Sequence, residues 1–193
     1  MPWVTGTTDR ENGGMRVTDT LAFVRGRWQL DRVLTDHRTG AEGRFTGHAL
    51  VAPAPPGQPG QPGQPGQPGQ PGQPGQPGEW CYTEEGELRF AAHTGPASRR
   101  LRYQGRADGT VAVRFADGRP FYVLDLRAGQ AEAEHGCGRD RYLLSHRVLA
   151  ADLLEEVWRV RGPDKDYLAI TRLTRKPLHD APTYRTMDGN NVT

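Results

Sequence analysis

Two charged side chains fall on strand faces that are otherwise apolar. Successive side chains of a strand alternate between its two faces, so in the segment RWQLDRVL Arg32 shares a face with Trp28. In the segment WCYTE, Glu84 shares a face with Trp80 and Tyr82 in the same way. A buried charge is costly unless it is paired or needed. Two interpretations stay open. Either Arg32 and Glu84 pair with each other or lie at a solvated rim, or they line a ligand pocket in which Arg32 holds an anionic group and Tyr82 and Glu84 orient it.

Further residues on other strands are candidates for such a pocket. Arg102 and Tyr103 are adjacent on one strand, so only one of them faces inward, and either could join the pocket. The segment HGCGRDRY places His135 and Tyr142 close together in the sequence. The ligand-binding residues that the sequence predicts are therefore Arg32, Tyr82, Glu84, Arg102, His135 and Tyr142.

The same segment contains residue types that bind zinc. His135 and Cys137 could converge on an ion, but no second cluster supplies the remaining ligands, and Asp140 falls where a turn needs a short hydrogen-bond acceptor. A Cys–His nucleophile pair would need a third group to orient the histidine, and the sequence identifies none. We therefore predict neither a metal nor another cofactor, and we assign no catalytic residue.

The elements that must position these residues are almost all strands. About ten short runs of alternating apolar and polar residues are separated by a few turn residues each, as at the hairpin signal Asp117-Gly118. A short helical turn is expected where Asp19 can cap the run TLAFVR, before Gly26. The pattern predicts an all-β fold. The simplest form is a single antiparallel barrel of about 8–10 strands with one short N-terminal helical turn, because a meander must protect its edges.

A perfect Pro-Gly-Gln repeat interrupts this domain from Gly57 to Gly78. A collagen-like triple helix would require three hairpin tips to come together, so we predict instead an extended, solvated, disordered loop over residues 54–79. The two ends hold few apolar residues, and we predict disordered tails at residues 1–18 and 177–193. The β domain then spans residues 19–176.

Composition excludes several classes of protein. The net charge of +2, from 25 basic and 23 acidic residues, is too balanced to predict nucleic-acid binding. The sequence has no apolar run of about 18 residues that could span a membrane. Its N-terminus lacks the basic start and apolar stretch of a secretory signal, so we predict a cytoplasmic protein with Cys81 and Cys137 as free thiols.

The first and last predicted strands resemble the lipocalin and calycin signature. Gly26 and Trp28 form a Gly-x-Trp on the first strand, and the last strand offers Arg172 and Arg175 in ITRLTR. The resemblance implies a barrel in which an arginine lies across the indole face at the closed end, as a cation–π contact.

A wider set of segments resembles an uncharacterised bacterial and fungal family, a domain of unknown function. The segments that match are GRWQLDR, GRFTGHA, YTEEGEL, RRLRY, FADGRPFYVLDL, HGCGRD and VWRVRGPDKDYLAITRLTR, the last of which contains Trp158. This resemblance implies a compact β domain and no particular activity.

Three functional hypotheses follow from the sequence. The favoured one is a cytoplasmic module, monomeric or weakly dimeric, that binds a small, partly anionic or aromatic ligand. The second is a cofactor-free lyase or isomerase that uses Arg, Tyr and Glu on a small carboxylate substrate. The third is a structural or interaction protein whose insert contacts partners.

Overall fold

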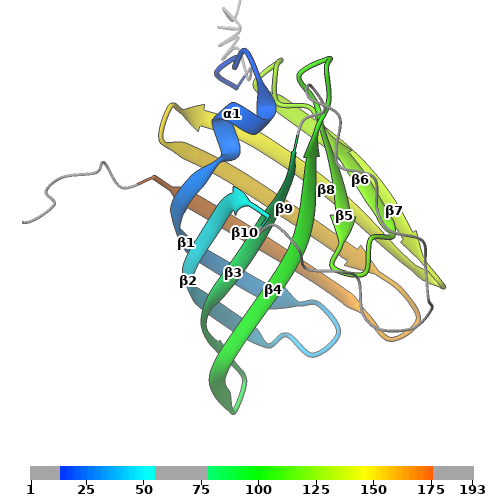
Figure 1. Cartoon of the computed structure of the whole chain (residues 1–193). Coiled ribbons are helices and arrows are strands. Elements are labelled where there is room, and N and C mark those ends of the chain that lie inside the picture. The colour runs from blue at the N-terminus through cyan, green and yellow to red at the C-terminus, as the bar shows by residue number, and fades with distance from the viewer. Residues whose placement is uncertain (1–13, 55–77, 176–193) are drawn as a thin grey trace, which may run out of the picture.

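The described residues, 14–54 and 78–175 of a computed structural model, form one short helix and ten strands (Figure 1). The elements are α1 Thr20–Val24, β1 Gly26–Asp36, β2 Glu42–Pro53, β3 Glu79–Phe90, β4 His93–Gly105, β5 Val111–Phe115, β6 Pro120–Leu124, β7 Gln130–Cys137, β8 Asp140–Ala150, β9 Leu153–Arg161 and β10 Asp166–Thr174. The prediction of an all-β fold with one short N-terminal helical turn is confirmed. No helix in these described ranges is long and apolar enough to cross a membrane.

All ten strands pair antiparallel in one sheet that curls into a nearly closed barrel. The order is β6-β5-β4-β3-β2-β1-β10-β9-β8-β7, so strands that follow each other in the sequence pair, except β6 and β7, and β1 also pairs with β10. The two ends of this order, β6 and β7, lie side by side in Figure 1. The His135 imidazole Nδ1 lies 3.1 Å from the Phe121 carbonyl oxygen and so joins β7 to β6 at this seam.

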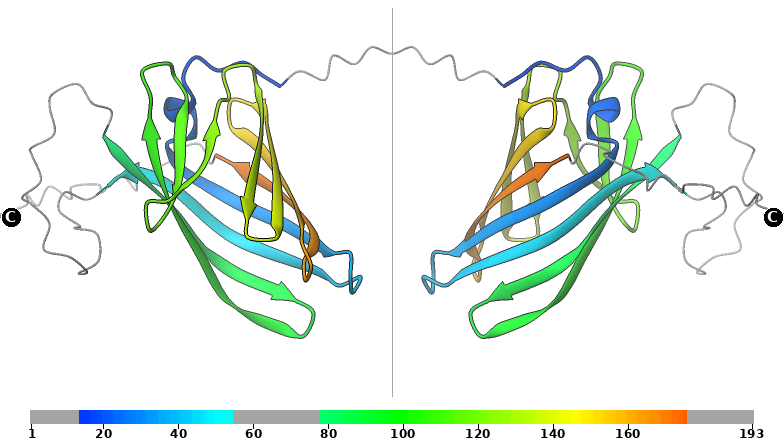
Figure 2. Two further views of the ribbon diagram at one scale, coloured as in Figure 1. Left: turned by 90° about the vertical axis from the view of Figure 1, so that its right-hand side faces the viewer. Right: turned by 90° about the vertical axis from the view of Figure 1, so that its left-hand side faces the viewer.

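Helix α1 lies over one end of the barrel, and the hairpins β1–β2 and β3–β4 project at the opposite end (Figures 1 and 2). The Asp19 carboxylate accepts a hydrogen bond from the Ala22 amide at 2.7 Å and so caps the helix. The interior near α1 is filled by apolar and aromatic side chains, among them Trp28, Leu30, Leu124, Leu126, Val148 and Leu173. This end of the barrel is therefore a packed core.

Trp28 and Arg175 close the barrel beneath α1. The Trp28 side chain is 1% exposed, and its indole Nε1 donates to the Val24 carbonyl at 2.8 Å. The Arg175 guanidinium lies 4.4 Å from the centre of the Trp28 ring and donates to the Phe23 carbonyl. The arginine expected across the indole face is thus Arg175.

Arg172, the other candidate for that contact, faces outward. Thr171 and Leu173 are buried inside the barrel, so alternation places Arg172 on the outer face. Its Nε lies 3.7 Å from the Glu155 carboxylate. The prediction of a role for Arg172 at the closed end is therefore wrong.

The predicted disordered segments fall mostly outside the described residues. This holds for residues 1–13, 55–77 and 176–193. The predicted N-terminal disordered tail includes residues 14–18, but the Met15 amide donates to the Val148 carbonyl at 2.7 Å and holds this segment on the barrel. The Ala54 amide donates to the Glu79 carbonyl at 2.9 Å, so the insert leaves and re-enters the sheet at adjacent strand ends.

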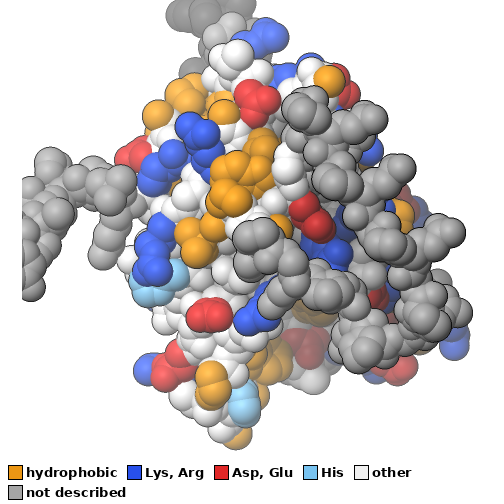
Figure 3. All heavy atoms as spheres, viewed as in Figure 1, with side chains coloured by type: hydrophobic (Ala, Val, Ile, Leu, Met, Phe, Trp, Pro, Cys, Tyr) orange, Lys and Arg blue, Asp and Glu red, His pale blue; other side chains and the backbone are white. Residues whose placement is uncertain are grey.

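Charges of both signs are distributed over the barrel surface. Figure 3 shows one face, on which Lys and Arg side chains are interspersed with Asp and Glu. Most strands present such residues on their outer face, and many pair with a neighbour, as Arg44 does with Asp31. The functional question therefore concerns the charges that lie inside.

Candidate functional site

Arg32 and Glu84 pair inside the barrel. Arg32 Nη1 donates to Glu84 Oε1 at 2.5 Å, and Arg32 Nε donates to the Thr171 hydroxyl at 2.7 Å. The two side chains are 14% and 3% exposed. Of the interpretations that the sequence left open, the pairing is observed, and it lies in the interior rather than at a solvated rim.

Glu84 has two further donors. Arg99 Nη2 and the Tyr82 hydroxyl both donate to Glu84 Oε2 at 2.7 Å. Burial raises the pKa of Glu84, but the charges of Arg99 and Arg32 outweigh burial and hold it below its ordinary value. Burial raises the pKa of Tyr82 well above its ordinary value, so this hydroxyl keeps its proton and acts as a donor. Glu84 is therefore an ionised carboxylate surrounded by donors.

A second carboxylate lies beside the same arginines. Glu156 Oε2 lies 3.1 Å from His146 Nε2, and Glu156 Oε1 lies 3.6 Å from Arg99 Nη2 and 3.9 Å from Arg32 Nη2. Burial raises the pKa of Glu156, but the hydrogen bond from His146 and the charge of Arg99 lower it to about 2. The Tyr122 hydroxyl lies 3.4 Å from His146 Nε2. We call Arg32, Glu84, Arg99 and Glu156, with their neighbours Tyr82 and His146, the interior charge cluster.

Two cavities adjoin the cluster. The larger, which we call the mouth cavity, has a volume of about 150 Å³ and opens toward the projecting hairpins; its lining residues are Arg32, Leu34, Phe45, Glu84, Leu88, Ala97, Ser98 and Arg99. The smaller lies toward α1, is lined in part by Tyr82, His146 and Glu156, and measures about 20 Å³. The mouth cavity has room for a small molecule, whereas the inner one has room for about one water.

Two aromatic side chains, Trp158 and Tyr142, pack next to the interior charge cluster. The Arg99 guanidinium lies 4.6 Å from the centre of the Trp158 ring, and Tyr142 packs edge-on against Trp158. Lys165 Nζ donates to Asp140 at 2.6 Å and to the Tyr142 hydroxyl at 3.3 Å. Tyr142 therefore lies near the cluster, but it does not line the mouth cavity.

Two predicted ligand-binding residues lie elsewhere. Arg102 is on the outer face of β4, where it forms an ion pair with Glu79, because Leu101 and Tyr103 occupy the inward positions. His135 packs against Phe115 and Phe121 at the seam between β6 and β7. The prediction of Arg102 as a pocket residue is wrong, because alternation along β4 turns its side chain outward. His135 contacts β6 at the barrel seam rather than a ligand pocket.

Three residues of the cluster were missed, and alternation could have found them. Arg99 is two residues from Leu101 and four from Tyr103 in RRLRY, so it shares their inward face. Glu156 lies two residues from both Leu154 and Trp158, so it shares their inward face of β9. His146 likewise shares the inward face of β8 with Leu144 and Val148.

The geometry does not favour acid–base chemistry at this cluster. A general base must accept a proton near the operating pH, but Glu84 is held ionised by three donors. Tyr122, His146 and Glu156 form a hydrogen-bonded series of the kind that can relay a proton. However, this series faces the inner cavity of about 20 Å³, which is too small for a substrate. In the described ranges, no group of three or more His, Cys, Asp or Glu side chains could hold a metal ion.

The fold and its interior define an antiparallel all-β barrel with a charged cluster near its open end. The chain belongs to the DUF6314 family of unknown function, whose profile matches residues 24–175.

Several solved structures are similar to this chain at low sequence identity, and the first of those named here shares its fold. An S-type phycobiliprotein lyase from Guillardia theta is 9% identical, with a TM-score of 0.54 over 81% of this chain and 90% of that chain. A redesigned β-barrel bound to DFHBI is 10% identical, with a TM-score of 0.38 over 82% of this chain and 100% of that chain. A protein of the DUF3598 family from Nostoc punctiforme is 10% identical, with a TM-score of 0.37 over 83% of this chain and 49% of that chain. The comparison with curated proteins gives no match.

The pKa of Glu156 predicts that acid destabilises the barrel. Its folded value of about 2 lies below the ordinary 4.5, so the ionised carboxylate stabilises the fold above pH 4.5, and this contribution is lost as the pH falls toward 2. Thermal unfolding followed by circular dichroism should show a midpoint that falls over this range. The Glu156→Gln variant should show a weaker pH dependence, and an unchanged dependence would contradict the assignment.

Proposed function

We propose that this barrel binds a small organic anion, an aromatic or apolar carboxylate, in the mouth cavity. The observation that carries the proposal is the placement of two guanidinium groups, Arg32 and Arg99, on the wall of that cavity. Arg32 Nη2 is buried and has no hydrogen-bond partner among the described residues. The Arg99 side chain is 26% exposed. Arg32 Nη2 lies 3.9 Å from Glu156 Oε1, so the partly exposed Arg99 guanidinium is the group that a ligand can reach most directly.

The chemistry of the cavity matches a carboxylate that carries an apolar group. A guanidinium presents a planar fork of N–H donors that fits a carboxylate with two parallel hydrogen bonds. Leu34, Phe45 and Leu88 form the apolar part of the cavity wall. The Trp158 ring lies 4.6 Å from the Arg99 guanidinium and helps to hold this group at the cavity wall.

The energetics of the cluster also support a binding role. Ion pairs inside a protein are often no more stabilising than apolar residues of similar volume, because both charges lose their hydration. Arg32, Glu84, Arg99 and Glu156 all lie in the interior, so stability alone does not explain them. Glu84 and Glu156 balance the two arginines and hold them in place before the ligand arrives.

The other hypotheses rank below this one. The lyase or isomerase hypothesis has the likeness of fold to a phycobiliprotein lyase in its favour, but Glu84 is a poor base. The interaction hypothesis depends on residues 57–78, most of which lie outside the described ranges. The lipocalin-like character, the cytoplasmic location and the bacterial or fungal origin stay predictions.

A titration with paired probes tests the proposal. We expect benzoate or 2-naphthoate to bind saturably in isothermal titration calorimetry, and the uncharged benzamide to bind far more weakly, because the amide does not satisfy a guanidinium fork. The Arg99→Lys variant keeps the charge that Glu84 needs but removes the fork. It should weaken binding by about tenfold, which is the loss of one good hydrogen bond.

Arg102→Lys is the matched control, because Arg102 lies on the same strand but on the outer face. It should bind like the wild type. If no aromatic carboxylate binds, or if benzamide binds as tightly as benzoate, the proposal is contradicted. If Arg99→Lys and Arg102→Lys weaken binding equally, the site lies elsewhere.

A further inference from the structure

The outer face of β1, β10 and β9 carries an exposed apolar stripe. Val33 is 47% exposed and Ile170 is 39% exposed, and the two are paired neighbours on β1 and β10. Ile170 in turn pairs with Val157 on β9, and Val157 pairs with Ser145 on β8. The two exposed side chains are therefore adjacent, and together with Val157 they form a continuous apolar stripe across three strands.

A row of charged residues runs parallel to this stripe, two residues closer to α1. It consists of Asp31, Arg172, Glu155 and Arg147, on β1, β10, β9 and β8, each paired with the next in register. Glu155 lies 3.7 Å from Arg172 and 3.1 Å from Arg147. The signs therefore alternate along the row: negative, positive, negative, positive.

We propose that the chain forms a two-fold symmetric dimer through these two rows. The two-fold axis runs parallel to the strands, between β10 and β9. It places each row against the same row of the partner, with the order of the strands reversed. Because the row has four charges of alternating sign, each charge then faces an opposite charge in the partner's row. Arg172 then faces the partner's Glu155, and Asp31 faces the partner's Arg147.

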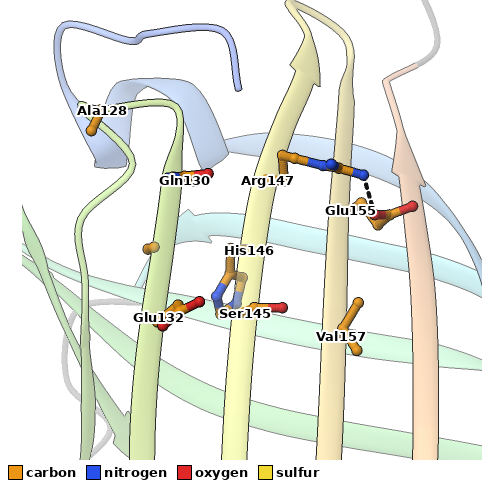
Figure 4. Close-up of a pocket in the computed structure, with 9 residues that line it drawn as sticks. Ala128, Gln130, Glu132, Ser145, His146, Arg147, Glu155 and Val157 are labelled. Atoms are coloured by element: carbon orange, nitrogen blue, oxygen red, sulfur yellow. Dashed lines mark hydrogen bonds and ion pairs between the residues drawn. The ribbon is translucent and has the colours of Figure 1, made fainter. Parts of the chain in front are cut away.

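The apolar stripe is complementary to itself under the same axis. Ile170 faces the partner's Val157, and Val33 faces the partner's Ser145. Ser145 and Val157 lie in a shallow hollow of about 570 Å³ on the outer face of β7, β8 and β9, which Figure 4 shows together with the Arg147–Glu155 ion pair. The protruding Val33 of each copy therefore has a depression to enter.

Charge complementarity selects a second copy of this chain as the occupant. A displacement by one strand would place like charges against each other, so the pattern fixes one arrangement of the two copies. A different protein would need the same alternating row at the same spacing, whereas a second copy has it by identity. This dimer does not depend on the mouth cavity, which opens at the end of the barrel.

A charge-swap experiment tests the dimer. Wild-type protein should sediment as a reversible dimer whose fraction rises with concentration. Arg172→Glu should weaken the dimer by roughly tenfold or more, because the new glutamate faces the partner's Glu155. Glu155→Arg should weaken it similarly, because two arginines then face each other. An equimolar mixture of the two variants should dimerise again, since each mixed pair regains both opposite-charge contacts.

Two further variants complete the test. Ile170→Asp should give a monomer with an unchanged circular dichroism spectrum, because this side chain is exposed in a single copy. Arg100→Glu, an exposed change on β4 far from the two rows, should leave the dimer unchanged. A wild type that is monomeric at every concentration overturns the proposal. So does a wild-type dimer whose swapped variants fail to reassociate on mixing, because the interface then lies elsewhere.

Discussion

The Glu84→Ala variant is expected to lose about 3–5 kcal/mol of unfolding free energy, the usual effect of removing one partner of a buried ion pair. Glu84 accepts hydrogen bonds from Arg32, Arg99 and Tyr82. Its removal leaves two guanidinium groups and a hydroxyl inside the barrel, where Glu156 is the one carboxylate among the described residues that still lies within 4 Å of the arginines. Urea unfolding followed by tryptophan fluorescence measures the loss.

Glu87→Ala is the matched control for this experiment. Glu87 lies on the same strand and pairs with Arg89 at 2.7 Å, but it is exposed. Because exposed ion pairs contribute about 0–1 kcal/mol, this variant should unfold almost like the wild type. A loss at Glu84 no greater than the loss at Glu87 would contradict the interior charge cluster.

The Trp28→Ala variant is expected to lose a similar amount, about 3–5 kcal/mol, as large buried aromatic side chains do when truncated. Trp28 fills the closed end of the barrel, and its removal leaves a cavity beneath α1. It also removes the surface on which the Arg175 guanidinium lies and the hydrogen bond to the Val24 carbonyl. Denaturant unfolding at neutral pH checks the value.

Trp80→Ala is the control for the loss of a tryptophan that is only partly buried. Trp80 lies on β3 and is partly exposed. Its truncation should therefore cost clearly less than that of Trp28, because less apolar surface is buried to begin with. Equal losses for the two variants would contradict the special contribution assigned to the buried Trp28 side chain and its contact with Arg175.

Alternation along each strand could be predicted from the sequence, and with it much of the candidate site. Arg32, Tyr82 and Glu84 were placed on inward faces from their positions relative to Trp28 and Trp80, and the structure puts them inside. The prediction of Arg102 is wrong because adjacency to Tyr103 alone does not determine which of the two side chains faces inward. Extending the phase of Leu101 by one step would have selected Arg99 instead.

Pairing between distant strands could not be predicted from the sequence. Arg32 and Glu84 are 52 residues apart, and their contact depends on the register of β1, β2 and β3 together. The irregularity between Val113 and Arg114 is a second example. It shifts the pairing of β5 with β6, and both Phe121 and Tyr122 are buried, which strict alternation does not allow.

The most direct test of the account is to observe the two guanidinium groups while a carboxylate binds. In two-dimensional ¹H–¹⁵N NMR spectra, the Nε–H signals of Arg32 and Arg99 can be assigned from their lysine variants. We predict that benzoate shifts both signals and the Trp158 indole signal along one saturable curve, and that benzamide shifts none of them. If aromatic carboxylates leave both guanidinium signals unchanged, the mouth cavity does not bind organic anions and the central claim is wrong.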